Sequence, residues 1–462
     1  MKRFVVMSLM AASVISATNA ATNAELEERI RVLEEMVYGN KKKIKSNKKT
    51  IIEVKKHDSF DNIKFGVDFR NSVDVLDYKN NITGESAKNS SLLASRLYLT
   101  MAAAPTDKLI FKGKLAIYSL WGAHLFGEDS GLKDWSASSK ATDTVMRVKE
   151  AYFVYSTALG AQPISVSIGR RPSTDGFLAN YRENNPEEGS PLAHITNMEV
   201  NALMVKLDWS RFIPGAYTKF VGGRAHTGAT TGVYSIGHTT PWGPNAEVDG
   251  SEDDNVDFFV TLGDAYNNGQ YQVMYEWAHI FNTKGENIAT TEKKVGAGTA
   301  DLFSLGFKID GIGDEIDGFL ANTTAFISAA YSHYDADNGY QLLGSSDGGT
   351  RSGSSIWAGV IFPDMITEKG KIGIEYNHGS KYWTPMTWAE DSAIGSKIAV
   401  RGDAYEAYWN FYLFGEEYLP AQVRYTYMQH DYTPNVNCAG WVPVQETDIT
   451  AQDLRFSVSY KY

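Results

Sequence analysis

The sequence predicts an all-β transmembrane barrel of about sixteen antiparallel strands that follows an N-terminal α-helical coiled coil. Three observations predict the barrel: a two-residue alternation in the last segment, its recurrence upstream, and connections that alternate between short and long. In segment 453–462 the apolar face carries Leu454, Phe456, Val458, Tyr460 and Tyr462. The opposite face carries Arg455, Ser457, Ser459 and Lys461. Strands with one apolar and one polar face, repeated without helices to cover them, suit a wall between lipid and water.

Residues 1–20 have the organisation of a secretory signal peptide. Lys2 and Arg3 precede an apolar run over 4–15, and small residues at 18–20 offer a cleavage site, with Ala24 as a second one. An apolar run of about a dozen residues is too short to cross a bilayer as a helix. We therefore expect an exported protein that enters a membrane only as strands.

The composition narrows the class of protein. Aromatic residues make up 12% of the chain, with 26 Tyr and 10 Trp, as expected if rings line two membrane interfaces. The net charge of −11 argues against nucleic-acid binding by an exported protein. The one cysteine, Cys438, cannot form an intrachain disulfide and suggests no role. No Pro- or Ser-rich linker interrupts the chain, so residues 59–462 are interpreted as one barrel.

Residues 21–58 form the predicted coiled coil. Apolar and Asn side chains recur from Leu26 to Val54 at alternating spacings of four and three residues, which is an unbroken heptad seam. The central seam residues are Ile30, Leu33, Val37, Asn40, Ile44, Asn47 and Ile51. Two Asn one heptad apart lower the stability of the seam and fix its register and oligomer number. The alternative is one amphipathic helix that lies on the barrel.

The coiled coil also suggests partners. Its β-branched seam positions, combined with Asn, resemble the stalks of trimeric autotransporters, and this resemblance implies three parallel helices in a homotrimer. Eight lysines between positions 41 and 56 make the second half of the helix basic. They favour contact with anionic cell-wall polymer or lipid headgroups, although such a run is more often a solvated face.

Residues 63–462 contain sixteen candidate strands, each identified by the alternation of apolar and polar residues. They lie near 63–76, 92–103, 108–121, 145–157, 163–169, 199–209, 216–226, 256–266, 270–281, 301–310, 323–334, 354–362, 370–378, 402–414, 420–431 and 453–462. In the fourth strand, Glu150 and Tyr152 prefer the lumen, which turns Arg147 and Lys149 outward unless a β-bulge resets the alternation.

The connections between these strands sort by length. Short ones, such as 104–107 and 158–162, alternate with long ones, such as 76–91, 122–144, 170–198, 227–255, 282–300 and 378–401. Outer-membrane barrels have short periplasmic turns and long outer loops. An even strand count places both ends of the barrel, and therefore the coiled coil, in the periplasm. Sixteen strands enclose an aqueous lumen.

The third long connection contains the run Gly169-Arg-Arg-Pro-Ser-Thr-Asp-Gly176, followed by an Asn-, Pro- and Glu-rich segment over 181–191. Residues 63–462 resemble the trimeric sixteen-stranded outer-membrane porins, in which the third outer loop folds into the lumen and narrows it. The run 169–176 also resembles a family of bacterial outer-membrane porins with no assigned substrate. The terminal Tyr462 resembles the terminal aromatic of outer-membrane proteins, which is more often Phe. The coiled coil departs from common porins.

This resemblance implies a constriction built from both signs of charge. The candidate loop residues are Arg170, Arg171, Asp175, Arg182, Glu183, Glu187 and Glu188. The candidate lumen-wall residues are Arg70, Arg96, Lys112, Lys114, Arg424 and Arg455. Opposed charges across a narrow passage create a transverse field that favours polar solutes over apolar ones. The alternative is that Arg170 and Arg171 pair with Glu or with lipopolysaccharide phosphate at the rim.

Other motifs are weak. The GxSxG pattern at 344–348 lacks the strand-to-helix turn of a hydrolase, so we expect no enzyme. The acidic cluster in the fourth outer loop, Asp249, Glu252, Asp253, Asp254 and Asp257, has two interpretations. It either bridges Ca²⁺ to lipopolysaccharide or is simply solvated. The nine His show no zinc spacing, and no cofactor is expected.

The sequence therefore predicts a porin in the outer membrane of a Gram-negative bacterium, with the coiled coil as a stalk in the periplasm. It would pass small hydrophilic solutes or ions passively and contact outer-membrane lipid and lipopolysaccharide. The alternative is a plugged barrel that serves as a structural anchor or adhesin and links the outer membrane to the cell wall.

Overall fold

The computed structural model describes residues 63–121, 145–185, 189–227, 255–313, 318–343, 347–367, 369–387, 390–434 and 443–462. Several predictions fall outside these residues and stay predictions: the signal peptide over 1–20, the coiled coil over 21–58 with its seam, Glu187, Glu188, Cys438 and most of the fourth-loop acidic cluster.

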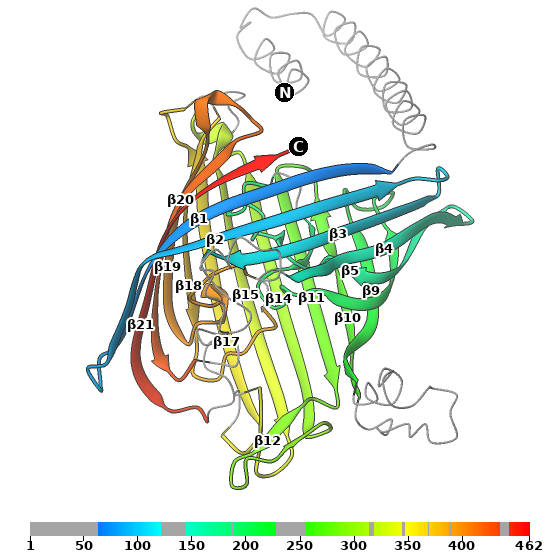
Figure 1. Cartoon of the computed structure of the whole chain (residues 1–462). Coiled ribbons are helices and arrows are strands. Elements are labelled where there is room, and N and C mark those ends of the chain that lie inside the picture. The colour runs from blue at the N-terminus through cyan, green and yellow to red at the C-terminus, as the bar shows by residue number, and fades with distance from the viewer. Residues whose placement is uncertain are drawn as a thin grey trace, which may run out of the picture.

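Sixteen strands close into one antiparallel barrel, in which consecutive wall strands pair and β1 pairs with β21 (Figure 1). The wall strands are β1 (Lys64–Asn80), β2 (Ser86–Ala103), β3 (Leu109–Leu120), β4 (Val145–Leu159), β5 (Gln162–Arg171), β8 (Val200–Asp208), β9 (Tyr217–Thr227), β10 (Asn255–Asn267), β11 (Tyr271–Phe281), β14 (Gly298–Asp310), β15 (Thr324–Ala336), β17 (Arg351–Pro363), β18 (Lys371–Gly379), β19 (Gly402–Tyr412), β20 (Pro420–Tyr432) and β21 (Glu446–Lys461). This confirms the predicted all-β barrel and its sixteen strands. Within the described residues, no helix has the length and apolar character needed to cross a membrane.

The remaining elements are short and lie in the connections. They are β6 (Gly176–Phe177), β7 (Gly189–Leu192), β12 (Gly285–Asn287), β13 (Lys293–Lys294), β16 (Tyr340–Leu342) and the 3₁₀ turns η3 (Leu320–Asn322), η4 (Lys397–Ala399) and η5 (Leu413–Gly415). Strands β12, β13 and β16 form a small sheet, which lies at the lower end of the barrel in Figure 1.

The first predicted long connection, over 76–91, is wrong. Strands β1 and β2 continue through it with a bulge between Asp74 and Leu76, and the chain turns only at 81–85. The apolar alternation stops near Leu76 because the residues beyond it are polar on both faces. Backbone pairing does not need apolar side chains, however, so the ladder continues after the sequence signal has ended.

A bulge also resolves the fourth strand. Lys114 pairs with Glu150 and Leu115 with Val148, so Lys149 is the extra residue of β4. The bulge resets the alternation, and Arg147 shares the inward face with Ala116. Lys149 is buried and lies over the ring of Tyr98. The expectation that Arg147 and Lys149 point outward is therefore wrong, and the alternative of a bulge is confirmed.

The wall has the two faces that the sequence predicts. Along β15, Phe326, Ser328 and Ser332 are buried, whereas Ile327 and Tyr331 between them are exposed. In β21 the exposed residues are Leu454, Phe456 and Tyr460, and the buried residues are Arg455, Ser457 and Ser459. Exposed apolar side chains thus cover the outside of the barrel, as a wall in contact with lipid requires.

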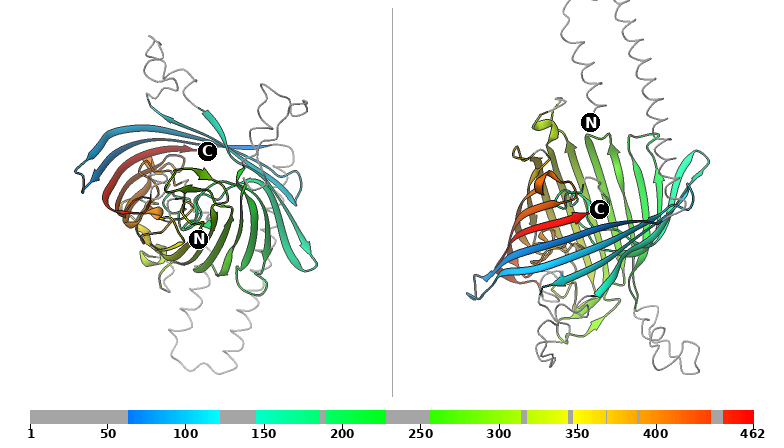
Figure 2. Two further views of the ribbon diagram at one scale, coloured as in Figure 1. Left: turned by 90° about the horizontal axis from the view of Figure 1, so that it is seen from below. Right: turned by 45° about the horizontal axis from the view of Figure 1, so that its top comes forward.

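Two loops fold back against the inward faces of the wall strands. They are loop 3 (residues 172–199) and loop 7 (residues 380–401), and segments of the chain are seen within the ring of strands in Figure 2. Both loops carry apolar residues that are fully buried, among them Phe177, Leu192, Trp383 and Ile398. Burial of these side chains against the wall supplies the apolar contact that holds each loop in place.

Two glycines of the wall make room for these loops. A Cβ atom at Gly306 in β14 would lie 2.8 Å from atoms of both Phe177 and Leu192 in loop 3. A Cβ atom at Gly353 in β17 would lie 2.3 Å from the backbone nitrogen of Trp383 in loop 7. A side chain at either position would push the loop away from the wall, so glycine is what permits the close approach.

Candidate functional site

A cavity of about 560 Å³ lies between β1–β5, β21 and loop 7. We call it the charged cavity. Its basic lining residues are Arg70, Arg96, Arg147, Lys149, Arg170 and Arg455. Its acidic lining residues are Asp74, Glu199 and Asp391. The basic residues outnumber the acidic ones by six to three, so the lining carries a net positive charge.

Asp391 of loop 7 lies in an arginine cage at this cavity. Its carboxylate is 2.8 Å from Arg70 Nη2 and 2.7 Å from Arg96 Nη1. Its backbone carbonyl accepts hydrogen bonds from Arg455 at 2.9 Å and from Arg424 at 3.5 Å. Burial alone raises the pKa of Asp391, but the surrounding arginines outweigh burial and hold that pKa well below its usual value. The cage therefore fixes a negatively charged loop residue against a basic wall.

A second group of charges joins loop 3 to loop 7. Arg182 Nη1 lies 2.7 Å from Glu390 Oε1, and Arg182 Nε lies 3.0 Å from Glu183. Arg182 also donates to the backbone carbonyl of Glu390 at 2.6 Å. Arg424 of the wall lies 3.8 Å from Glu183. Burial raises the pKa of Glu183, but Arg182, Arg70 and Arg424 together outweigh burial and lower this pKa to about 2, so the carboxylate stays charged.

A third contact holds loop 7 to β18 and β19. Lys397 Nζ lies 2.7 Å from Glu375 Oε2 and also pairs with Glu406, and all three side chains are almost completely buried. Trp357 donates its indole N–H to the same oxygen of Glu375 at 2.9 Å. Buried charges of this kind are tolerated only when they are paired and hydrogen-bonded, so the group specifies the docked position of the loop.

His194 joins loop 3 to β15 and β17. The imidazole bonds with Ser328 of β15 at 2.7 Å and with Ser355 of β17 at 2.9 Å. It also meets Trp357 and Trp383 edge to face, with ring centroids 5.8 and 5.6 Å away. Burial lowers the pKa of His194 to about 3, so the ring is neutral at ordinary pH.

We expect acid to loosen loop 3 through His194. The pKa of His194 is lowered from its ordinary value of 6.5, so the free ring takes up a proton before the docked ring does. Docking is therefore fully stabilised above pH 6.5 and weakens by roughly 3 kcal/mol from this group by about pH 4.5. The change is measured as loss of hydrogen-exchange protection in loop 3. A His194→Gln variant, which cannot titrate there, should lack this loss.

Asp175 of the same loop opposes His194 in this pH range. Burial, with repulsion from Glu183, raises the pKa of Asp175 from 3.8 to about 6. The docked carboxyl therefore takes up a proton first, and this group stabilises docking as pH falls below 6. The test of His194 is thus the difference between the parent and His194→Gln at each pH. Equal pH profiles in the two proteins would contradict the assignment.

The structure separates the predicted loop residues. Arg170 lines the charged cavity, whereas Arg171 lies 4.8 Å from the ring centroid of Tyr152 and donates to Ser167. Asp175, Arg182 and Glu183 lie among the loops, and Glu187 and Glu188 are outside the described residues. The five residues that the structure describes therefore do not gather at one point.

The predicted wall residues also divide. Arg70, Arg96, Arg424 and Arg455 contact loop 7 at Asp391. Lys114 pairs with Glu150, and Lys112 lies on the same face of β3 but is exposed. The residues that the sequence did not single out are Asp391, Glu390 and Lys397 of loop 7, with His194 of loop 3. One sequence signal could have indicated that loop 7 is buried. The loop contains the apolar residues Trp383, Ile394, Ile398 and Val400, which are unusual in a solvent-exposed connection.

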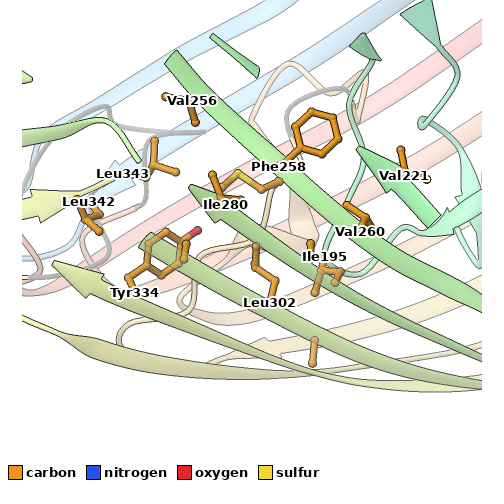
Figure 3. Close-up of a cluster of buried hydrophobic side chains, with 14 of the residues drawn as sticks. Ile195, Val221, Val256, Phe258, Val260, Ile280, Leu302, Tyr334, Leu342 and Leu343 are labelled. Carbon is orange, nitrogen blue, oxygen red and sulfur yellow. The ribbon is translucent and has the colours of Figure 1, made fainter. Parts of the chain in front are cut away.

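A second cavity of 240 Å³ lies between loop 3 and the inward faces of β8–β11, and we call it the apolar chamber. Its wall residues include Met204, Val221, Phe258, Val260 and Ile280. Figure 3 shows several of these side chains close to Ile195 of loop 3. The lumen thus has a charged side and an apolar side, separated by the two loops.

Among the residues that the structure describes, no three His, Cys, Asp or Glu side chains come together as a metal site would require. Asp257 of the fourth-loop acidic cluster instead pairs with Arg224, at 2.7 Å. The proposed Ca²⁺ site rests otherwise on residues outside the described part of the chain.

Comparison with curated proteins finds no match for the chain. Comparison with solved structures finds several outer-membrane proteins. The trimer form of OmpT from Vibrio cholerae, an outer-membrane protein, is 13% identical, with 86% of this chain and 99% of that chain covered and a TM-score of 0.43. The anion-selective porin from Comamonas acidovorans is 11% identical, with coverage of 87% and 100% and a TM-score of 0.48. OprB from Pseudomonas putida is 14% identical, with coverage of 87% and 94% and a TM-score of 0.48.

The family comparison covers most of the chain. The model of the family described as "Protein of unknown function (DUF3373)" matches residues 86–460, which begin at β2 and end within β21. Because this match spans well over half of the sequence, the chain belongs to the DUF3373 family.

Proposed function

We propose that the protein is a porin in the outer membrane of a Gram-negative bacterium, through which small hydrophilic solutes or ions diffuse passively. One observation carries the proposal. A closed sixteen-stranded barrel with an apolar outside encloses a charged cavity of about 560 Å³ beside the two inserted loops. A barrel of sixteen strands is wide enough for an aqueous channel, and a polar lining lets water and ions enter it.

The passage runs along β1–β5 and β21, beside the segment of loop 7 that carries Asp391. Loop 3 and loop 7 narrow the lumen from the other side, and loop 7 presents Asp391 to Arg70, Arg96 and Arg455. This arrangement replaces the constriction predicted from loop 3 alone. Solutes are selected by size and by the transverse field between the basic wall and the loop carboxylates.

The excess of basic residues favours anions. Arg70, Arg147, Lys149 and Arg170 line the charged cavity, and the structure gives Arg147 no carboxylate within ion-pair distance among the described residues. Fixed positive charge in a narrow polar passage lowers the energy of an anion and raises that of a cation. The channel therefore passes chloride in preference to potassium.

Recordings from purified protein in planar bilayers test this function. We expect stepwise conductance, and in a potassium chloride gradient a reversal potential of the sign that chloride preference gives. The predicted coiled coil holds three barrels together in the periplasm, so conductance should appear in groups of three. Absence of any conductance from correctly folded protein would contradict the porin function, whereas single steps would contradict only the trimer.

The second candidate is a plugged barrel that anchors the outer membrane to the cell wall. Loop 3 and loop 7 bury apolar side chains completely against the wall inside the barrel, and this favours a lumen that is closed along β11–β19. The Lys-rich coiled coil would then bind anionic cell-wall polymer. Silent bilayers, together with co-sedimentation of the protein with purified cell wall and its loss without residues 41–56, would favour the anchor over the porin.

A further inference from the structure

The apolar chamber departs from the polar lining expected of a water-filled barrel. Strand register places its inward residues in layers. Met204, Val221, Val260 and Ala278 lie side by side on β8, β9, β10 and β11 in one layer. The next layer toward the outer loops contains Phe258 and Ile280. Four adjacent strands thus turn apolar side chains toward the lumen. Apolar surface in contact with water is unfavourable, so these side chains do not serve a water-filled passage.

The chamber is closed on its lumen side by the two inserted loops. Pro191, Thr196 and Met198 of loop 3 line it, together with Met386 of loop 7. At its outer end it is lined by Ala225 and His226, which are exposed. The chamber therefore opens toward the outer loops and ends blindly at the layer below Val260.

That lowest layer contains Lys206, Lys219, Leu262 and Glu276, side by side on β8, β9, β10 and β11. Lys206 and Lys219 lie directly opposite each other on β8 and β9 and share the ring of Tyr217, at 4.3 and 5.1 Å from its centroid. Lys219 also donates to Ser190 Oγ at 2.5 Å. Like charges that face each other across a ladder are destabilising. The ring of Tyr217 and the hydroxyl of Ser190 offset the repulsion between the two lysines only in part.

Arg171 and Lys219 both line the chamber, as does Lys284 at its outer end. In the described part of the chain, no carboxylate lies within ion-pair distance of Arg171, Lys206 or Lys219. Glu276 is the one acidic residue that lines the chamber, and both of its carboxylate oxygens already have partners in loop 3. It accepts hydrogen bonds from the Leu192 N–H and the Thr196 hydroxyl, both at 2.8 Å, and so holds loop 3 to the wall.

We propose that the apolar chamber binds a small amphipathic anion, whose apolar body lies among Val221, Val260 and Ala278 and whose carboxylate pairs with Lys219. An apolar cavity of about 150 Å³ holds a benzene ring. The 240 Å³ of the chamber therefore accommodates one ring with a short chain. The ligand contributes a carboxylate to Lys219, which has none within ion-pair distance in the described part of the chain, and the apolar walls select against fully hydrophilic anions.

This site does not depend on conduction, because binding is measured at equilibrium whether or not ions pass. The test is isothermal titration calorimetry of the full-length protein in lipid nanodiscs, with empty nanodiscs as the blank. The probes are 4-phenylbutyrate, the uncharged 4-phenylbutanamide and the ringless butyrate. We expect 4-phenylbutyrate to bind at least about tenfold more tightly than either of the others, with the negative heat-capacity change that marks burial of apolar surface.

Two variants separate the charge from the apolar body. Lys219→Gln should weaken 4-phenylbutyrate about tenfold and leave 4-phenylbutanamide unchanged. Ala278→Phe should fill the chamber and abolish binding of both. Lys112→Gln is the matched control, because Lys112 lies on the inward face of β3, outside the chamber. Equal affinity for the charged and uncharged probes, or an unchanged affinity in Lys219→Gln, would overturn the proposal.

Discussion

Replacing Asp391 by Asn is expected to raise the preference of the channel for anions about fivefold. The substitution removes one negative charge from the arginine cage and leaves the backbone carbonyl that Arg455 and Arg424 bind. One unit charge near an ion's path is worth roughly 1 kcal/mol in water, which is about fivefold in a permeability ratio. Arg70, which pairs with this carboxylate, is then left uncompensated at the charged cavity. Reversal potentials in a salt gradient measure the change.

Asp403→Asn provides the matched control for this measurement. Asp403 carries the same charge on β19, but it bonds with Tyr376 and His378 on the exposed side of the wall. Its removal should leave ion preference unchanged, because a charge on the far side of the wall is separated from the lumen and screened by salt. An Asp391→Asn channel with the parent's reversal potential would place the ion path away from the arginine cage.

Replacing Lys397 by Met is expected to release loop 7 from the wall. The substitution leaves the buried carboxylates of Glu375 and Glu406 without the ammonium that pairs with both. Breaking a buried ion pair by removing one partner destabilises by about 3–5 kcal/mol. Backbone bonds hold the barrel independently, so we expect the loss to appear as local opening of loop 7. Hydrogen-exchange protection at Ile398 and Ala399 measures it.

Two further variants show whether the buried charges are the cause. Adding Glu375→Gln to Lys397→Met removes one stranded charge while keeping an acceptor for the Trp357 indole, so protection should partly return. Lys294→Met removes an exposed pair with Asp337 and should leave protection in loop 7 unchanged. Full protection of loop 7 in Lys397→Met would show that its apolar contacts alone keep it docked.

The strands could be predicted because lipid on one side and a polar or filled lumen on the other impose a two-residue period. That period identified β15, β19 and β21 and gave the correct faces of β21. It also explains the error at β1 and β2. The alternation ends near Leu76, where the residues become polar on both faces, although pairing continues to Asn80.

The candidate site could be predicted only in part, because long-range contacts have no period. Arg70, Arg96, Arg424 and Arg455 were identified from the polar faces of their strands, but their common partner, Asp391, lies in a different loop from the one expected. The apolar chamber was missed for a similar reason. In β10 both faces are apolar near Phe258 and Phe259, so alternation does not indicate what covers the inner one.

The central claim, that ions pass along the charged cavity and not through the apolar chamber, is tested by blocking each route in turn. In a Cys438→Ser background, Ala94→Cys places a thiol in the charged cavity and Ala278→Cys places one in the apolar chamber. Each channel is recorded before and after reaction with an anionic methanethiosulfonate, and mass spectrometry confirms the modification. We predict that modification lowers the current and the anion preference of Ala94→Cys and leaves those of Ala278→Cys unchanged. A block at Ala278→Cys with no effect at Ala94→Cys would contradict the proposed route.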